Sequence, residues 1–189
     1  TTREEKITVS TDSKTWFFPK SVKISPYVFS LHAGPYAFWT SQYKGANVIP
    51  LRLFARKSLA KYVNQGDWFA YSQFGFKYFE NYFGYDYPFK KYDQLIVPNF
   101  NFGAMENVAA VTFSERFIQR GKTTDLDRER LAVTLLHEMA HMWFGDLVTM
   151  KWWNDLWLNE SFATFMATKA VENYGKFKNP WQSFYNSKK

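Results

Sequence analysis

The feature that most constrains this chain is a pair of histidines four residues apart, His137 and His141, in a stretch without glycine or proline. Residues 131–144 are rich in good helix formers, so we predict an α-helix there. Side chains four apart project from one face of a helix, and two imidazoles held in this way supply half of a tetrahedral zinc site. Glu138 lies beside them, where its carboxylate can act as a general base toward a metal-activated water.

An ordinary buried amphipathic helix that carries two polar residues by chance is the alternative. The chain contains three histidines, His32, His137 and His141, and two of them fall at ligand spacing. This concentration favours the metal site. His32 lies outside every metal motif, and we expect it to be structural.

We predict the third ligand at Glu160. Eighteen residues lie between His141 and Glu160. Apolar residues surround it in a pattern that predicts a second, largely buried helix: Leu156, Leu158, Phe162, Ala163, Phe165, Met166 and Ala170. A buried carboxylate is costly unless it is neutralised or binds a metal, and these neighbours do not favour a solvated, salt-bridged glutamate. Two histidines and one glutamate leave a fourth position open for water or substrate, as in catalytic rather than structural zinc sites.

A second motif lies upstream of the histidines. It consists of Gly103, Ala104, Met105, Glu106 and Asn107. Taken alone it could be an ordinary turn plus a cap. With the zinc motif, in this order and at this approximate separation, it resembles the signature of the M1 aminopeptidases (the aminopeptidase N family). Flanking segments match at residues 87–93, 143–146 and 152–157, and the resemblance is strong from about Val48 to Gly175.

The resemblance implies an α+β fold, with a thermolysin-like (gluzincin) catalytic domain in which a mixed sheet accompanies the zinc-site helices. Residues 108–113 would form the edge strand that lines the cleft, where a peptide can add as another strand. Residues 1–36 would be the last strands of a preceding β domain, with residues 24–29 as its closing strand. Residues 37–189 would be the N-terminal part of the catalytic domain.

The resemblance also implies a function: zinc-dependent release of N-terminal amino acids from peptides. His137, His141 and Glu160 would hold one Zn²⁺ per chain, and Glu138 would be the general base. Glu106 would pair with the free α-ammonium group of the substrate. The substrate-binding segment would comprise Gly103, Ala104, Met105, Glu106 and Asn107, with Gly103 and Ala104 offering backbone groups.

Several positions around the predicted site carry further expectations. Each ligating histidine should use its second ring nitrogen on an outer acceptor, for which Asp155 is a candidate unless it caps its own helix. Phe102 would line the pocket for the first substrate side chain or belong to the core. Phe113 stands where the family often has tyrosine, which should alter a contact around the site rather than the chemistry.

The family's transition-state tyrosine lies on a later helix, beyond Lys189. Tyr174 and Tyr185 follow Glu160 too closely to take its role, and we expect them in the core or the tail. This chain taken alone is therefore expected to bind zinc but to turn over substrates poorly.

Two alternatives to the peptidase remain open. One is an epoxide hydrolase of the leukotriene type, which shares both motifs. The other is a non-catalytic basic binding module with a vestigial motif, because the formal net charge is +7. Peptide turnover would separate the peptidase from the first alternative, and a stoichiometric metal would separate it from the second.

Composition narrows the partners. There is no dense Lys/Arg run and no recognised nucleic-acid motif, so peptides with a free N-terminus are expected and nucleic acids are not. No apolar stretch approaches the length of a membrane span. The absence of cysteine excludes disulfides and fits a reducing compartment, and we predict a cytoplasmic location. The aromatic fraction of 21% predicts a large aromatic core.

Local patterns predict the remaining elements. Strands are predicted at residues 7–10, 16–19, 27–33, 48–55, 95–97 and 108–113. Helices are predicted at residues 58–63 and 67–83, with Gly84 at the C′ position of the latter. The zinc helix should be capped within residues 123–127 and end at Phe144, and the second metal helix should run from residue 154 or 155 to Tyr174.

Overall fold

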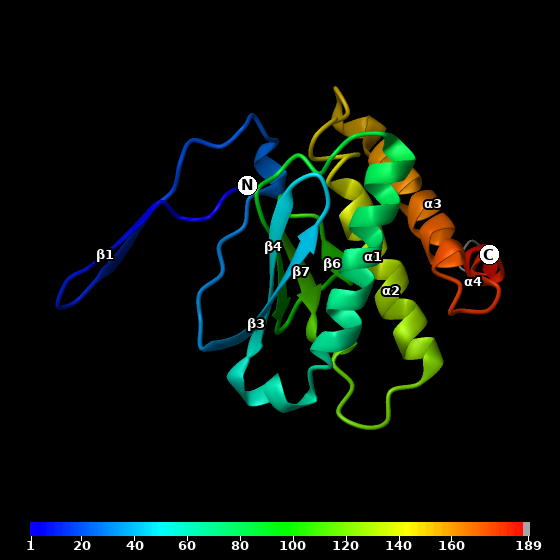
Figure 1. Cartoon of the computed structure of the whole chain (residues 1–189), viewed down its shortest axis with the longest axis horizontal. Coiled ribbons are helices and arrows are strands. Elements are labelled where there is room, and N and C mark those ends of the chain that lie inside the picture. Colours follow the sequence, from blue (N-terminus) through cyan, green and yellow to red (C-terminus); the bar gives the residue numbers. More distant parts are fainter. Residues whose placement is uncertain (187–189) are drawn as a thin grey trace.

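The computed structural model describes residues 1–186 and has a mixed sheet packed against a layer of helices. Figure 1 shows the sheet beside α1 and α2, with α3 on the far side of these helices. The five strands lie in the order β3 (Tyr36–Lys44), β4 (Val48–Arg56), β5 (Tyr92–Val97), β7 (Ala110–Ser114) and β6 (Ala104–Met105). Strands β4, β5 and β7 are parallel, while β3 and β6 run antiparallel at the two edges. The mixed sheet with several helices is compatible with the predicted α+β class, and its thermolysin-like character stays a prediction.

Our prediction that residues 108–113 form the edge strand is wrong. The 103–107 motif folds back on β7 and pairs with it, Ala104 opposite Phe113 and Met105 opposite Thr112. A tight turn allows this, because the N–H of Ala110 donates to the carbonyl of Asn107 at 2.9 Å and Ala109 takes a positive φ of 56°. The motif itself therefore forms the edge of the sheet. A strand of two residues is too short to show the alternation of side chains by which strands are predicted from sequence.

The two long flanking helices follow the predicted bounds closely. Helix α1 spans Gln65–Phe83 and α3 spans Leu156–Tyr174. Each ends at a glycine in the left-handed conformation, Gly84 at φ 63° and Gly175 at φ 73°. Only glycine takes this conformation without steric cost, which explains the sharp ends. A short helix, α4, spans Pro180–Asn186.

Helix α2 spans Asp125–His141 and begins with a capping box, in which Thr124 and Asp127 each bind the other's backbone N–H. It ends three residues before the predicted Phe144. The reason is a tightened last turn: the N–H of Met142 donates to Met139 and that of Trp143 donates to Ala140, both at 3.1 Å and both three residues back.

Short 3₁₀ helices replace two predicted elements. The predicted helix at 58–63 is the 3₁₀ helix η2 (Lys57–Tyr62). The predicted strand at 27–33, including the proposed closing strand at 24–29, is wrong: the segment holds only the 3₁₀ turn η1 (Pro26–Val28). Proline at the first position presets this turn, and the N–H of Phe29 closes it on the carbonyl of Pro26 at 3.3 Å.

The chain contains two further 3₁₀ helices, η3 (Glu115–Phe117) and η4 (Trp153–Asp155). The first residues of the chain form an isolated hairpin of β1 (Lys6–Val9) and β2 (Lys14–Phe17), near the predicted strands. In Figure 1 this hairpin extends away from the rest of the molecule. None of the helices within residues 1–186 combines the length and apolar character needed to cross a bilayer.

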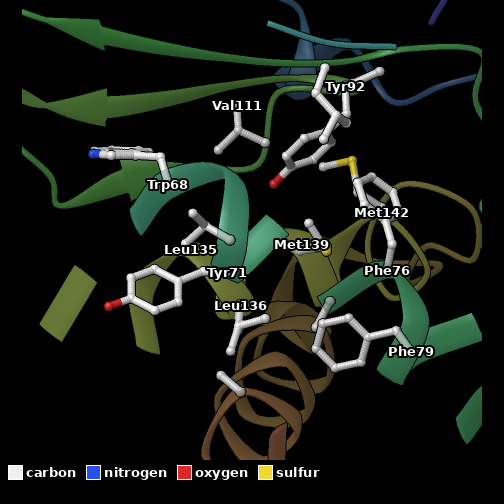
Figure 2. Close-up of a cluster of buried hydrophobic side chains, with 14 of the residues drawn as sticks. Trp68, Tyr71, Phe76, Phe79, Tyr92, Val111, Leu135, Leu136, Met139 and Met142 are labelled. Atoms are coloured by element: carbon white, nitrogen blue, oxygen red, sulfur yellow. The ribbon is translucent and has the colours of Figure 1, made fainter. Parts of the chain in front are cut away.

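The core is aromatic, as predicted, and lies between the sheet and α1 and α2. Figure 2 shows Trp68, Phe76 and Phe79 of α1 facing side chains of α2 and the sheet. Phe76, Phe79, Leu135 and Met139 are fully buried. Burying one such side chain contributes roughly 1.5–3 kcal/mol, so this face of α2 is fixed against the core. The adjoining face, which carries the histidines, is thereby held toward α3.

Candidate metal centre

The three predicted ligands lie together between α2 and α3. The Nε2 atoms of His137 and His141 are 3.1 Å apart, and Oε2 of Glu160 lies 3.3 Å from the first and 3.6 Å from the second. Ligands on a tetrahedral zinc with bonds of about 2.0–2.1 Å sit about 3.3 Å from one another. The spacing therefore fits this metal, and this is the sole group of its kind that residues 1–186 contain. The role of the three residues as ligands stays a prediction.

Outer contacts fix which nitrogen of each imidazole faces the centre. Nδ1 of His141 lies 2.9 Å from the carbonyl oxygen of Phe144, so it must carry the hydrogen and donate. The hydroxyl of Thr164 donates to the carbonyl of Glu160 at 2.8 Å, which leaves its oxygen to accept from Nδ1 of His137 at 3.3 Å. Both Nε2 atoms then present lone pairs to each other, an arrangement that a cation between them would stabilise.

Our candidate for an outer acceptor, Asp155, is wrong. The contacts above go to Phe144 and Thr164 instead. Asp155 precedes the first residue of α3, yet its side chain makes no capping hydrogen bond either. Both actual partners follow from the local path of the chain: Phe144 lies in the tightened turn after α2, and Thr164 lies one helical turn after Glu160.

Electrostatics of the cluster favour positive charge at its centre. Burial acts to lower the pKa of His141, but contact with Glu160 and the charges of Glu106 and Glu138 raise it to about 9. Interaction with His137 and His141 holds the pKa of Glu160 far below its usual range. For His137, burial prevails and lowers the pKa. The three groups can thus accept a proton or a metal cation between them.

Glu138 is buried next to the cluster with a free oxygen. Its residue is 4% exposed, and Oε2 has no hydrogen-bond partner. Burial raises the pKa of this carboxyl well above its ordinary value, opposed by the charge of His141 and aided by Glu106 and Glu160. A buried carboxylate without a partner is unfavourable for folding, which points to a role that uses the open oxygen.

The 103–107 motif places Glu106 and Asn107 in the interior, at 4% and 6% exposure. The side chain of Asn107 is used within the protein: its amide donates to the carbonyl of Val28 at 3.3 Å, and its oxygen accepts from Thr112 at 2.7 Å. Thr112 also contacts Nε2 of His32 at 3.2 Å, in agreement with the structural role expected of that histidine. Asn107 thus ties the edge of the sheet to the N-terminal segment.

Three aromatic positions answer open expectations. Phe102 is 69% exposed, which removes the core alternative for it. Phe113 is fully buried and packs edge-on against Trp68 with 4.8 Å between the ring centroids. Tyr174 packs against Phe74 at 4.8 Å and against Tyr71 at 5.5 Å, as expected of a core residue.

Three residues near the site were missed in the sequence. Tyr27 lies close to Glu106 and its hydroxyl is 3.5 Å from the amide of Asn159; burial and the charge of Glu106 raise its pKa. Asp146 is 4% exposed, with no hydrogen-bond partner for either oxygen. Arg116 lies against Gly103, where a Cβ would collide with its guanidinium. Of the three, only Asp146 could have been found from the sequence, because it lies in segment 143–146, which resembles the family.

Comparison with known proteins agrees with the motifs. The peptidase family M1 domain matches residues 70–189. Aminopeptidase N of Streptomyces lividans is 49% identical over 177 residues, 92% of this chain and 21% of that protein. Tricorn protease-interacting factor F2 of Thermoplasma volcanium is 38% identical over 179 residues, 94% of this chain and 22% of the relative. Glutamyl aminopeptidase of Bitis rhinoceros is 37% identical over 172 residues, 87% and 17% of the two chains. The chain thus spans about a fifth of the length of the curated relatives it matches.

Proposed function

The chain belongs to peptidase family M1, and we propose from that premise that it carries the metal-binding part of a zinc aminopeptidase active site. The single observation that carries the proposal is the convergence of His137, His141 and Glu160 beside the open oxygen of Glu138. The relatives that are named as aminopeptidases support the same reading.

His137, His141 and Glu160 would hold the zinc, with both imidazoles oriented by their outer contacts. When bound, zinc supplies Lewis acidity, which polarises a peptide carbonyl and lowers the pKa of water. Glu160 is the most exposed of the three, with 47% of its side chain accessible, so the centre is open to substrate on the α3 side.

Glu138 would move the proton. Its unpartnered oxygen can accept a proton from water and then deliver it to the departing amine. Burial raises its pKa well above the ordinary value of 4.5, which makes it a stronger base than a solvated glutamate. A general base works best when its pKa lies near the operating pH, and burial is the usual means of bringing a carboxyl there.

Glu106 would fix the register of the substrate. It follows directly after β6, the edge strand, to which an extended peptide can add through backbone hydrogen bonds. A peptide that runs antiparallel to β6 places its first residue at Glu106 and the following residues toward Gly103. The buried carboxylate would then pair with the free α-ammonium group, which limits cleavage to the first peptide bond.

The test is hydrolysis of an alanyl anilide, with and without N-acetylation, by intact zinc-loaded protein. We expect Glu138→Gln to keep the zinc and to lose kcat by about 10²-fold or more. Glu106→Ala should keep the zinc and weaken binding of the free-amine substrate by about 2–5 kcal/mol, since one partner of a buried charge pair is removed. Glu172→Gln, at an exposed position of α3, is the matched control and should behave as wild type.

Four results would contradict the proposal. Full activity of Glu138→Gln would refute the role of Glu138 as general base. Equal hydrolysis of acetylated and free substrates would refute the role of Glu106 in binding the substrate amine. Turnover of a lipid epoxide but of no peptide would favour the epoxide hydrolase alternative, and absence of bound zinc would favour the binding module. The cytoplasmic location stays a prediction, to be checked by fractionation of cells.

A further inference from the structure

A cavity of about 840 Å³ lies between α2, α3, α4 and η3. This volume falls within the range of about 300–1,000 Å³ that is usual for ligand pockets. Its wall includes Arg116, Arg130, Val133, Thr134, Thr164 and Thr168. The cavity begins beside the metal centre, because Thr164 both lines it and contacts Nδ1 of His137 at 3.3 Å.

Helical periodicity shows the direction in which the cavity runs. On α2, His137, Val133 and Arg130 succeed one another at intervals of three or four residues and so share one face. On α3, Glu160 and Thr164 are related in the same way. At 1.5 Å per residue, Arg130 lies about 10 Å along α2 from His137. The cavity therefore extends along both helices, away from the predicted zinc ligands.

The proposed substrate would enter this cavity with its downstream part. A peptide antiparallel to β6, with its first residue at Glu106, passes Ala104 and then Gly103. Arg116 lies against Gly103, on the same side as the cavity that it lines. The residues that follow the cleaved bond are thus directed toward Arg116 and then toward Arg130.

Within the described part of the chain, three other arginines are engaged in ion pairs, whereas these two are not. Arg52, Arg56 and Arg128 each form an ion pair with a carboxylate. Arg116 and Arg130 are exposed and form none within residues 1–186. Their charges are therefore available to a ligand.

The two carboxylates of the cavity wall accept hydrogen bonds from neutral groups of the protein. Asp127 accepts from the backbone N–H and the hydroxyl of Thr124 in the capping box, and Glu129 accepts from the hydroxyl of Ser183 at 2.9 Å. Asp127 also lies a further turn along α2 from Arg130, about 15 Å from His137 at 1.5 Å per residue. Arg130 therefore lies nearer to the metal centre than Asp127 does.

We propose that Arg116 and Arg130 bind a carboxylate on the part of the substrate downstream of the cleaved bond. The inference rests on the proposed aminopeptidase function and adds a substrate class to it. The carboxylate is either an acidic side chain or the C-terminus of a short peptide, and the planar fork of arginine complements either.

Two pairs of tripeptides test the proposal. Ala-Asp-Ala-amide and Ala-Asn-Ala-amide differ in the side-chain carboxylate, while Ala-Ala-Ala and its amide differ in the C-terminal one. We expect kcat/KM to favour the carboxylate by about fivefold or more in at least one pair, and the favoured pair identifies the source. Arg116→Gln with Arg130→Gln should bring that ratio close to one. Arg120→Gln, an exposed arginine outside the cavity wall, is the matched control and should keep the ratio.

The results of this experiment distinguish a failure of the carboxylate site from a failure of the proposed aminopeptidase function. Hydrolysis of all four peptides with both ratios near one overturns the carboxylate site and leaves the aminopeptidase standing. A preference that survives in the double variant overturns the assignment to these arginines. Hydrolysis of none of the peptides by zinc-loaded protein overturns the proposed function and the inference together. The single variants Arg116→Gln and Arg130→Gln, measured in the same way, serve if the double variant does not fold.

Discussion

Asp93 on β5 and Glu160 on α3 are carboxylates that each face two basic groups, yet their surroundings differ. Asp93 accepts two hydrogen bonds from Arg52, at 2.8 and 2.6 Å, and one from Lys91 at 2.8 Å. Lys91 also donates to the carbonyl of Ala109 at 2.8 Å. Glu160 faces the lone-pair side of His137 and His141, at 3.3 and 3.6 Å.

The difference separates a structural charge cluster from one that requires a ligand. The side chain of Asp93 is 6% exposed and its cluster is complete, since each charge has a partner within the protein. The side chain of Glu160 is 47% exposed, and the atoms that converge with it are all acceptors unless one is protonated. The first arrangement stabilises the fold, and the second provides a place for a cation.

The largest expected effect is on zinc. Glu160→Ala removes one of three predicted ligands, so we expect loss of stoichiometric zinc with little change in the stability of the metal-free protein. Chelation should destabilise wild type by about 4 kcal/mol when free zinc had stood at about 1,000 times its Kd, and should not destabilise the variant. Metal analysis and urea unfolding measure both. One equivalent of bound zinc in Glu160→Ala would show that Glu160 is not a required zinc ligand.

The second effect is on folding. Asp93→Asn leaves the buried Lys91 and the half-buried Arg52 without their carboxylate, and we expect the free energy of unfolding to fall by about 3–5 kcal/mol. The folded fraction should still bind zinc as wild type does, because the two clusters share no residue. Urea unfolding with zinc titration tests this. A loss below about 1 kcal/mol, or a parallel loss of zinc, would show that the Asp93 cluster is not the structural one.

A smaller effect is expected at Thr164. Thr164→Val conserves shape but removes the oxygen that accepts from Nδ1 of His137, and we expect zinc affinity to fall about 10- to 100-fold. Thr168→Val, one turn later, is the matched control, since that hydroxyl bonds the carbonyl of Thr164 and no histidine. Competition with a chelator of known affinity gives the two constants. An equal loss of zinc affinity in both variants would show that Thr164 does not orient His137.

The smallest effect is a pH dependence that belongs to Asp93. Burial acts to raise the pKa of Asp93, but hydrogen bonds from Arg52 and the charge of Lys91 together lower it below the ordinary 3.8. Between the lowered pKa and about 4, the unfolded chain binds the extra proton, so stability rises with pH there and is lost as the pH falls. One proton gives a slope of at most about 1.4 kcal/mol per pH unit. The difference between wild type and Asp93→Asn should show this slope below pH 4 and none near neutrality.

The sequence could predict the parts of the site that depend on neighbours along one helix. The spacing of His137 and His141 places them on one face whatever surrounds the helix, because helical geometry repeats every 3.6 residues. Gly84 and Gly175 marked the ends of α1 and α3 for an equally local reason. The pairing of Arg52 with Asp93 had no such signal, since 41 residues separate them.

Only the tertiary structure decided which segment is the edge of the sheet and which groups surround the metal centre. The 103–107 motif is the edge because a turn folds it onto β7, and Arg116 is brought over Gly103 by the same fold. Thr164 and Phe144, not Asp155, became the outer acceptors for a like reason. By itself the sequence determined the donor types and their place on α2 and α3, since these follow from bonds within a few residues. The meeting of α2 with α3, and of β6 with β7, depends on burial of side chains far apart in the chain, which no local pattern records.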